Sequence, residues 1–222
     1  MIDDTDPETV TALARAVGPE PDEILREMDD HAASEGFPTV GPEVGGWLTL
    51  LTRLSDARRV FEFGSGFGYS AYWFARALPP DGEFVLTEVD ADELDLAREY
   101  FDRGGLADRA RFEHGDALDI VERYDGPFDV VLIDNEKHRY REAFEAIEPT
   151  LQSGSFVLAD NAVTAGTTVD RDEVVALLAG EDVEASEGSR GIAEYISFVR
   201  EHEALDTSLL PLGSGLAVSR VR

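Results

Sequence analysis

Residues 60–71, VFEFGSGFGYSA, constrain the fold of this chain more than any other stretch. A short apolar run is followed by three alternating glycines, Gly64, Gly66 and Gly68, and then by an amphipathic segment, residues 69–78. This pattern predicts a buried strand, a tight turn and a helix that begins directly over the strand. Glycines this closely spaced are unfavourable unless another group must approach the backbone. In a parallel α/β sheet that group is usually a nucleotide-like ligand, so a plain strand-to-helix turn is the weaker interpretation.

The residues around the glycines indicate which ligand would bind. The dinucleotide fingerprint G-x-G-x-x-G requires glycine where this chain has Tyr69. Glu62, inside the strand, is unsuited to a pyrophosphate but can bind the ammonium of a zwitterionic amino-acid tail. The N–H groups of the loop can bind the carboxylate of that tail. The loop therefore favours S-adenosylmethionine over NAD. Tyr69 and Ser70 open the helix and are candidate cofactor contacts, although packing explains Tyr69 equally well.

Strands and helices alternate regularly after residue 59, which predicts an α/β fold with a doubly wound, mostly parallel sheet. The expected parallel strands are Val60–Phe63, Glu83–Val89, Ala110–His114, Phe128–Ile133 and Ser155–Ala159. Two apolar runs around the turn 213–215 predict a C-terminal antiparallel hairpin. Such a hairpin is typical of class I methyltransferases. We expect one domain, residues 1–222, in which a helical extension, residues 1–54, covers the active site.

Three helices are expected in that extension. Asp6 caps the first, whose apolar face consists of Val10, Leu13, Ala14 and Val17. The second spans Asp22 to about Ser34, with Ile24, Leu25 and Met28 facing inward and Gly36 as its terminator. Pro42 begins the third, which is expected to bury Val44, Trp47, Leu48 and Leu51.

Acidic residues follow the second and third strands. Glu88 ends the second strand, where a carboxylate can accept hydrogen bonds from ribose hydroxyls. Asp90 is a competing candidate, and its alternative role is to cap the next helix. After the third strand, Asp116 and Ala117 lie where an adenine would bind, and a simple helix cap is an almost equal alternative for Asp116.

Polar side chains also follow the fourth and fifth strands. Asp134 comes directly after one apolar run, and Asp160 and Asn161 come after the next. Two carboxylates and an amide form an oxygen-only set that suits Mg²⁺, Mn²⁺ or Ca²⁺ and not a tetrahedral zinc site. Helix capping is the alternative, but the double signal at neighbouring strand ends favours a metal site.

Lys137 is the only lysine of the chain, beside 18 arginines. Arginine keeps its proton in proteins, whereas lysine can lose its proton, particularly near a divalent cation. A leftover surface lysine is the alternative. Its position three residues after a predicted metal ligand favours a catalytic base.

The composition excludes several classes of protein and partner. The chain has no cysteine, no long apolar stretch and an acidic start, so we expect a cytoplasmic protein without disulfides, thiolate sites or membrane segments. Forty-seven acids against 19 bases give a net charge of −28. This charge resembles the adaptation of a halophile, in which concentrated salt screens self-repulsion. It also argues against nucleic acid as a partner, though less strongly if the charge reflects the habitat.

Four segments in this order, FEFGSGFGYSA, LTEVD, FDVVLIDNEKHRY and VLADNAVTAG, resemble the metal-dependent O-methyltransferases of the catechol and caffeoyl-coenzyme A type. The resemblance runs from about Val40 to Gly215. It implies a class I methyltransferase fold, S-adenosylmethionine as cofactor, a small-molecule acceptor and, commonly, a homodimer. It implies metal ligation by Asp134, Asp160 and Asn161, with Lys137 as base. The remaining cofactor positions are Val40, which covers the methionine end, Glu62, Glu88 and Asp134.

Three departures from the family pattern leave the acceptor open. Glu136 stands where catechol-specific members have an aromatic wall, Ala165 stands where they have a proline, and the closing turn lacks the usual acid-glycine. The interpretation is an O-methyltransferase for an acceptor with adjacent oxygens. The alternatives are methylation of nucleic acid or protein without a catalytic metal, a noncatalytic S-adenosylmethionine-binding protein, and an NAD-dependent oxidoreductase, which Tyr69 disfavours.

Overall fold

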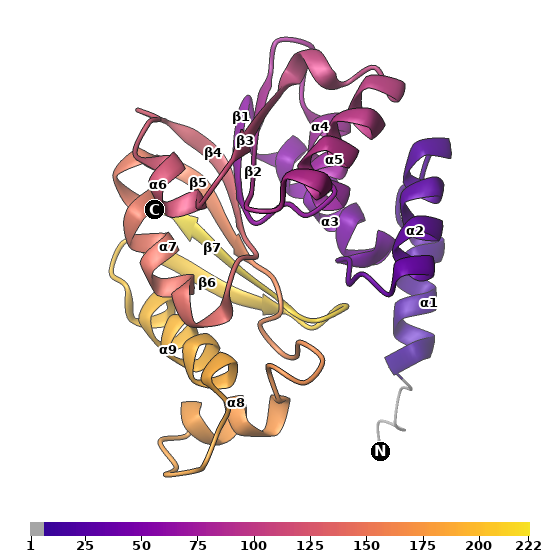
Figure 1. The fold of residues 1–222 in the computed structure, drawn as a ribbon. Helices are drawn as coiled ribbons and strands as arrows, with labels where there is room; N and C mark the ends of the chain where they lie inside the picture. Colours follow the sequence, from indigo (N-terminus) through magenta and orange to yellow (C-terminus); the bar gives the residue numbers. More distant parts are fainter. Residues whose placement is uncertain (1–6) are drawn as a thin grey trace.

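A computed structural model describes residues 7–222, and Figure 1 traces them. The strands within this range form one seven-stranded sheet in the order β3-β2-β1-β4-β5-β7-β6. Their bounds are β1 (Arg59–Phe63), β2 (Glu83–Glu88), β3 (Ala110–His114), β4 (Phe128–Ile133), β5 (Leu151–Ala159), β6 (Leu205–Leu210) and β7 (Leu216–Val221). Strands β1 to β5 are parallel, and β7 pairs antiparallel with both β5 and β6. The predicted mostly parallel, doubly wound sheet with a C-terminal hairpin is confirmed.

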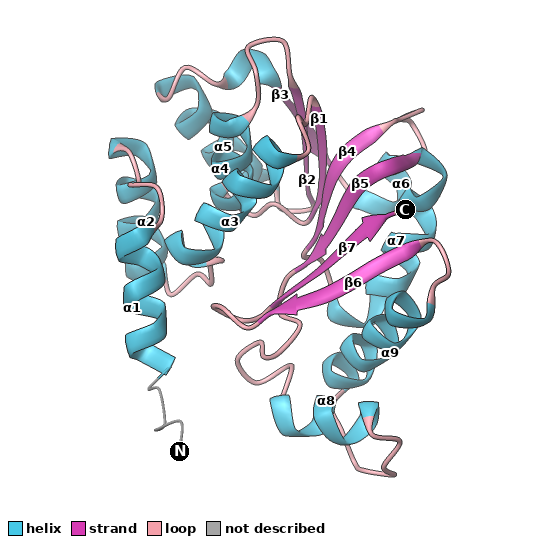
Figure 2. Cartoon of the chain, turned by 180° about the vertical axis from the view of Figure 1, so that it is seen from behind, coloured by secondary structure: helices cyan, strands magenta, loops and turns pink. Residues whose placement is uncertain are grey.

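Helices cover both faces of the sheet (Figure 2). The α-helices are α1 (Pro7–Val17), α2 (Glu23–Glu35), α3 (Gly41–Leu54), α4 (Tyr69–Ala77), α5 (Ala91–Arg103), α6 (Ala117–Val121), α7 (Tyr140–Ile147), α8 (Arg171–Leu178) and α9 (Glu187–Glu201). Short 3₁₀ helices are η1 (Ala107–Arg109), η2 (Lys137–Arg139) and η3 (Glu148–Thr150). Since successive strand residues point to opposite faces, Val130 and Leu132 pack with α2 to α5, whereas Val131 and Ile133 pack with α6 to α9.

Several sequence expectations differ from the structure in detail. Strand β2 ends at Glu88, because the N–H of Val89 donates to the Glu88 carboxylate at 2.8 Å instead of to a neighbouring strand. Strand β5 begins four residues earlier than expected, at Leu151. Strand β6 spans Leu205–Leu210, so Pro211 belongs to the turn, as befits a residue without an N–H to donate.

The N-terminal helices are confirmed, with two corrections about burial. Asp22 caps α2 and Gly36 ends it in a left-handed conformation, as predicted. The apolar face predicted for α1 is largely exposed: Leu13 is 66% and Val17 81% accessible. Trp47 is half-buried and not buried as expected, although Val44 and Leu51 of the same helix are buried. The predicted cap Asp6 lies outside the described residues.

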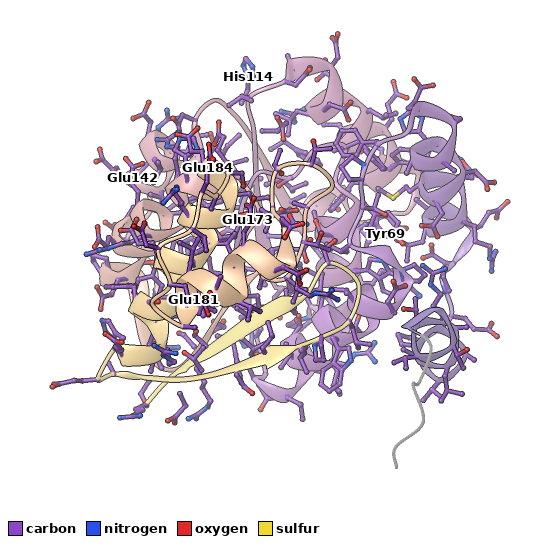
Figure 3. All side chains as sticks on the ribbon, turned by 90° about the horizontal axis from the view of Figure 1, so that it is seen from below. Tyr69, His114, Glu142, Glu173, Glu181 and Glu184 are labelled. Carbon is purple, nitrogen blue, oxygen red and sulfur yellow. The ribbon has the colours of Figure 1, made fainter. Side chains whose placement is uncertain are left out.

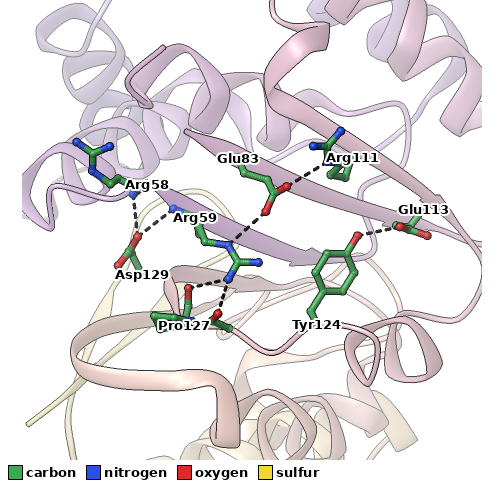
Figure 4. A network of polar contacts seen from close by, with 9 residues as sticks. Arg58, Arg59, Glu83, Arg111, Glu113, Tyr124, Pro127 and Asp129 are labelled. Carbon is green, nitrogen blue, oxygen red and sulfur yellow. Dashed lines mark hydrogen bonds and ion pairs between the residues drawn. The ribbon is translucent and has the colours of Figure 1, made fainter. Parts of the chain in front are cut away.

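The amino ends of the strands are joined by a polar network (Figure 4). Asp129 accepts hydrogen bonds from the backbone N–H groups of Arg58 and Arg59 at 2.7 and 2.9 Å. Glu83 bridges Arg59 and Arg111 at 3.2 and 3.1 Å. These contacts close the amino edge of the sheet and leave the carboxyl edge open. No helix within residues 7–222 is long and apolar enough to cross a membrane.

Candidate active site

A cleft of about 620 Å³ lies at the carboxyl ends of the parallel strands. Its walls come from the α2–α3 link, the loops after β1, β2, β3, β4 and β5, and the turn between β6 and β7. The lining includes most of the predicted site residues: Val40, Gly64, Gly66, Tyr69, Ser70, Glu88, Asp116, Ala117, Asp134, Lys137, Asp160 and Asn161. Glu62 and Gly68, also predicted, are not part of the lining.

The three glycines of the loop after β1 do different things, although each has a positive φ. A Cβ on Gly64 would lie 2.9 Å from the carbonyl oxygen of Asp134, so this glycine lets the loops after β1 and β4 touch. A Cβ on Gly66 would lie 2.8 Å from the ring of Phe37, which also lines the cleft. A Cβ on Gly68 would meet Ala97 at 2.9 Å. Gly68 therefore allows α4 to pack against α5.

Glu62 lies beneath the loop and is fully buried. Its Oε1 accepts a hydrogen bond from the hydroxyl of Ser70, and its Oε2 has no hydrogen-bond partner. Burial raises the pKa of Glu62 to about 8, with smaller contributions from Asp134 and Glu88. Ser70 lines the cleft in front of this acid, so a ligand in the cleft reaches Ser70 before Glu62. Tyr69 is 3% exposed, and burial raises the pKa of its hydroxyl.

Glu88 braces the glycine loop from the end of β2. Its Oε2 accepts the N–H of Gly66 at 2.8 Å, and its Oε1 accepts the N–H groups of Val89 and Asp90 at 2.8 and 3.0 Å. Asp90 instead caps α5, accepting the N–H of Asp92 at 2.9 Å, and it is not among the lining residues. Of the two acids, Glu88 faces the cleft.

Asp116 combines a cap with an ion pair. Its Oδ1 accepts the N–H of Leu118 at 2.9 Å, and its Oδ2 lies 2.8 Å from Arg139. The guanidinium of Arg139 holds the pKa of Asp116 below its usual range. Arg139 also pairs with Glu142 at 2.9 Å. Asp116 therefore caps α6, which was the alternative to an adenine contact, and it also lines the cleft beside Ala117.

Register brings the acids after β4 and β5 together. Ile133 pairs with Phe63 on one side and Ala159 on the other, so Gly64, Asp134 and Asp160 leave the sheet at the same level. The N–H of Asp134 donates to the carbonyl of Phe63 at 2.9 Å, and the N–H of Asp160 donates to the carbonyl of Ile133 at 3.2 Å. Strand ends far apart in the sequence therefore form one continuous edge.

Lys137 sits within this group. Its Nζ donates to Asp134 Oδ1 at 2.7 Å and to the hydroxyl of Tyr140 at 2.9 Å, and the lysine side chain is only 16% exposed. The Tyr140 hydroxyl donates to the carbonyl oxygen of Asp160 at 3.1 Å. Burial raises the pKa of Asp134, and Lys137 opposes that rise.

Asp160 is 3% exposed, and its Oδ1 has no hydrogen-bond partner. Burial raises the pKa of Asp160 to about 7, and the charge of Asp134 adds to the rise. Asn161 has φ of 55°, a left-handed conformation that turns the chain, and its amide donates to the carbonyl of Thr164 at 3.4 Å. No cluster of three or more His, Cys, Asp or Glu residues is arranged for a metal within the described part of the chain. The predicted set is smaller, with two carboxylates and an amide.

The sequence analysis missed several residues that the structure brings into the site. They are Phe37, Thr87, Asn135, Arg139, Tyr140, Thr167, Thr168 and, as an individual lining residue, Ser214. Tyr140 had a usable signal, because it follows Lys137 by three residues and so shares its helical face. Phe37 had none, because nothing in its local sequence relates it to the glycine loop.

Comparison with known proteins matches the chain to one family. The sequence profile of the O-methyltransferase family matches residues 18–222. A catechol O-methyltransferase from Niastella koreensis is 34% identical over 157 residues, which is 68% of this chain and 71% of the relative. A caffeoyl-CoA O-methyltransferase from Nicotiana tabacum is 24% identical and covers 94% of this chain and 87% of its own.

Solved structures agree. An O-methyltransferase from Bacillus cereus in complex with SAH superimposes with a TM-score of 0.83 at 27% identity, covering 98% of this chain and all of the other. The O-methyltransferase TomG from Streptomyces achromogenes in complex with SAM gives a TM-score of 0.82 at 26% identity and covers 96% of each chain.

Proposed function

The chain belongs to the O-methyltransferase family, as its motifs predicted, and from that premise we propose how this S-adenosylmethionine-dependent O-methyltransferase acts. It transfers the methyl group to one oxygen of a small acceptor with two adjacent oxygens, with the help of a divalent cation. The observation that supports this proposal best is the pairing of Asp134 and Asp160 at neighbouring strand ends, beside the glycine loop.

The residues present fit a cation. Asp134, Asp160 and Asn161 would hold it, and the buried Oδ1 of Asp160 has no other partner. Carboxylate and amide oxygens are ligands that Mg²⁺, Mn²⁺ and Ca²⁺ accept, and Mg²⁺ is the expected ion. When bound, the cation supplies positive charge that stabilises an acceptor oxygen as it loses its proton.

The chain itself binds the cofactor and aligns the two reactants. The loop from Gly64 to Gly68 borders the amino-acid tail of the cofactor in this proposal, with Glu62 and Ser70 behind it for the ammonium. Most N–H groups of the loop already have acceptors in the protein: that of Gly66 donates to Glu88, and that of Gly68 donates to the carbonyl of Ser65. In this proposal Glu88 accepts from the ribose hydroxyls, and Asp116 and Ala117, which also line the cleft, border the adenine. Methyl transfer from a sulfonium is an in-line displacement that depends chiefly on positioning. The α2–α3 link, which includes Val40, forms one wall of the cleft.

Lys137 takes the proton of the acceptor hydroxyl in this proposal. Its Nζ lies beside Asp134 and Tyr140, so it is held in one place at the cleft wall. To accept the proton it must first lose its own, which arginine cannot do.

The proposal is tested by measuring methyl transfer from S-adenosylmethionine to catechols and vicinal diols in molar KCl, with and without excess chelator. Transfer to an acceptor with adjacent oxygens that stops when chelator is added is the expected result. Undiminished transfer in chelator would favour the alternative in which Asp134 and Asp160 are structural.

The test uses high salt because we also propose that the net charge of −28 is an adaptation to salt. Figure 3 shows carboxylates such as those of Glu142, Glu181 and Glu184 on side chains around the ribbon.

Cofactor binding is expected to fail when Gly66 is replaced by valine. The new side chain would collide with Phe37, whose ring lies 2.8 Å from the Cβ position, and would strain a backbone with φ of 48°. Titration calorimetry should show a loss of at least about 100-fold in affinity for S-adenosylhomocysteine, since the loop can no longer take its shape. The wild type should not bind NAD comparably.

Gly105→Val is the matched control. Gly105 has φ of +68° and nothing within 4 Å of its Cβ position, so valine there brings the same kind of backbone strain without touching the cleft. It should lower the melting temperature and leave cofactor affinity unchanged. Normal binding by Gly66→Val, or tight NAD binding by the wild type, would overturn the assignment of the loop.

We also propose a homodimer. Helix α1 packs against α3, and these two helices expose large apolar side chains: Val10, Leu13, Val17, Leu50 and Leu54. Apolar side chains grouped on neighbouring elements are typical of an interface between proteins.

A further inference from the structure

The acceptor end of the cleft is the part beside Asp134 and Asp160, where the proposed acceptor binds. It contains one charged side chain, Glu136, that the proposed mechanism does not use. Among the residues that the structure describes, five acids line the cleft, against two bases, Lys137 and Arg139. Glu136 differs from the other charged residues of this lining, because its carboxylate is exposed and has no partner among the described residues.

The other charges are engaged. Glu88 accepts three backbone N–H groups at 2.8 to 3.0 Å. Asp116 pairs with Arg139 at 2.8 Å, and Asp134 pairs with Lys137 at 2.7 Å. Asp160 is buried and is the proposed cation ligand. Arg139 has Glu142 as a second partner at 2.9 Å, so neither base is free to bind an anionic ligand.

Glu136 differs from these four acids. It is exposed, it lines the cleft directly before Lys137, and its carboxylate has no hydrogen bond or ion pair with any described residue. It precedes the short helix η2 without capping it. Its carboxylate is therefore free to meet a group of the acceptor.

The other described residues that line this end of the cleft carry no positive charge that could compensate Glu136. The loop after β5 contributes Ala165, Gly166, Thr167 and Thr168, and the hairpin turn contributes Ser214. These side chains are small and neutral. A carboxylate or phosphate on the acceptor would face Glu136, and no described basic side chain of the lining is free to pair with it, whereas an ammonium would find an unpaired partner.

We propose that Glu136 determines acceptor specificity, selecting a molecule that carries a cationic group such as an ammonium beyond its adjacent oxygens, and rejecting anionic acceptors. This inference rests on the proposed function, because it assumes that the adjacent oxygens bind beside Asp134 and Asp160. A partly exposed charge pair contributes modestly, so attraction and repulsion together should favour a cation over an anion by roughly tenfold.

Three catechols that differ in one substituent test the inference: 3,4-dihydroxybenzylamine, 4-methylcatechol and 3,4-dihydroxyphenylacetate. For each, kcat/KM is measured with Mg²⁺, and the dissociation constant from the protein saturated with S-adenosylhomocysteine is measured by calorimetry. Both should rank the amine first and the acid last, and the preference should weaken as salt is raised. Glu136→Gln should bring the three together, and Glu136→Lys should reverse the order.

Glu181→Gln is the control variant. Glu181 is exposed and lies outside the cleft, in the segment after α8 (Figure 3), so its replacement changes the net charge equally and should leave the ranking intact. If none of the catechols is methylated but the charge ranking persists in binding, the proposed acceptor class fails and the role of Glu136 stands. Binding that ignores substituent charge, binding whose ranking survives Glu136→Gln, or no binding by any of the three would each overturn the role of Glu136.

Discussion

Replacing Lys137 by arginine or by alanine is expected to lower kcat by roughly 10²–10⁴-fold, the usual size of a general-base contribution. Arginine preserves the positive charge beside Asp134 but cannot give up its proton, so Lys137→Arg separates charge from proton transfer. Cofactor affinity, measured by calorimetry, should remain close to wild type in both variants. Raising the pH should partly restore both, because the acceptor hydroxyl then ionises without help.

Tyr140→Phe is the informative comparison for Lys137. It removes the hydroxyl that accepts from Lys137 Nζ at 2.9 Å and leaves the lysine and its contact with Asp134 in place. If the tyrosine only positions the lysine, its loss should reduce kcat by much less than the loss of Lys137. An arginine variant with nearly normal kcat at neutral pH would reduce Lys137 to an electrostatic role.

Asp160→Asn is expected to abolish cation binding and to lower activity by at least about 100-fold, because the charge of a carboxylate is the main attraction for a divalent ion. Cofactor affinity should change little. Removing the cation from the wild type with chelator should reproduce the loss of activity. A calorimetric titration of the protein with Mn²⁺ measures its cation affinity directly.

Stability gives a second readout for Asp160. Burial raises the pKa of this carboxyl to about 7 from an ordinary value of 3.8, so between these pH values the folded chain binds a proton that the unfolded chain has lost. The stability of the cation-free protein therefore falls as the pH rises through this range. Asp160→Asn removes that dependence and should melt at a higher temperature than the wild type at pH 8 in chelator.

The control for Asp160 is Asp119→Asn, an exposed acid of α6 outside the cleft. It should alter neither cation affinity nor the pH dependence of melting. Full activity of Asp160→Asn in chelator would refute the cation site, and a lower melting temperature than wild type at pH 8 would contradict the unfavourable burial of the charge.

Local sequence predicted the parts of the site that follow strand ends. The glycine spacing and the apolar runs locate the turn after β1 and the polar residues after β4 and β5, because a buried strand ends where its apolar run ends. The parallel register then places Asp134 beside Asp160 without further information. The fold was predicted on this basis, whereas the O-methyltransferase family was predicted from the resemblance of four sequence segments.

Contacts between distant segments could not be predicted in this way. Phe37 reaches Gly66, and Arg139 reaches Asp116, through packing that depends on how whole helices lie on the sheet. The exposed face of α1 is a second example: the periodicity of Leu13 and Val17 predicts an amphipathic helix but not what covers it. The burial of Glu62 and Gly68 below the loop could not be predicted from local sequence either, because it depends on how α4 and α5 pack.

The order of the strands has a consequence for how the protein folds. Strand β1 pairs with β4, about seventy residues away in the chain, and β5 pairs with β7, which ends the chain. No short fragment therefore contains a complete cleft, and its walls meet only when these long loops have closed. A ligand that binds the cleft binds the fully folded chain alone, and at a hundred times its dissociation constant it would stabilise that state by about 2.7 kcal/mol. Saturating cofactor should therefore slow the proteolysis of this protein, because it lowers the population of the unfolded chain that a protease cleaves.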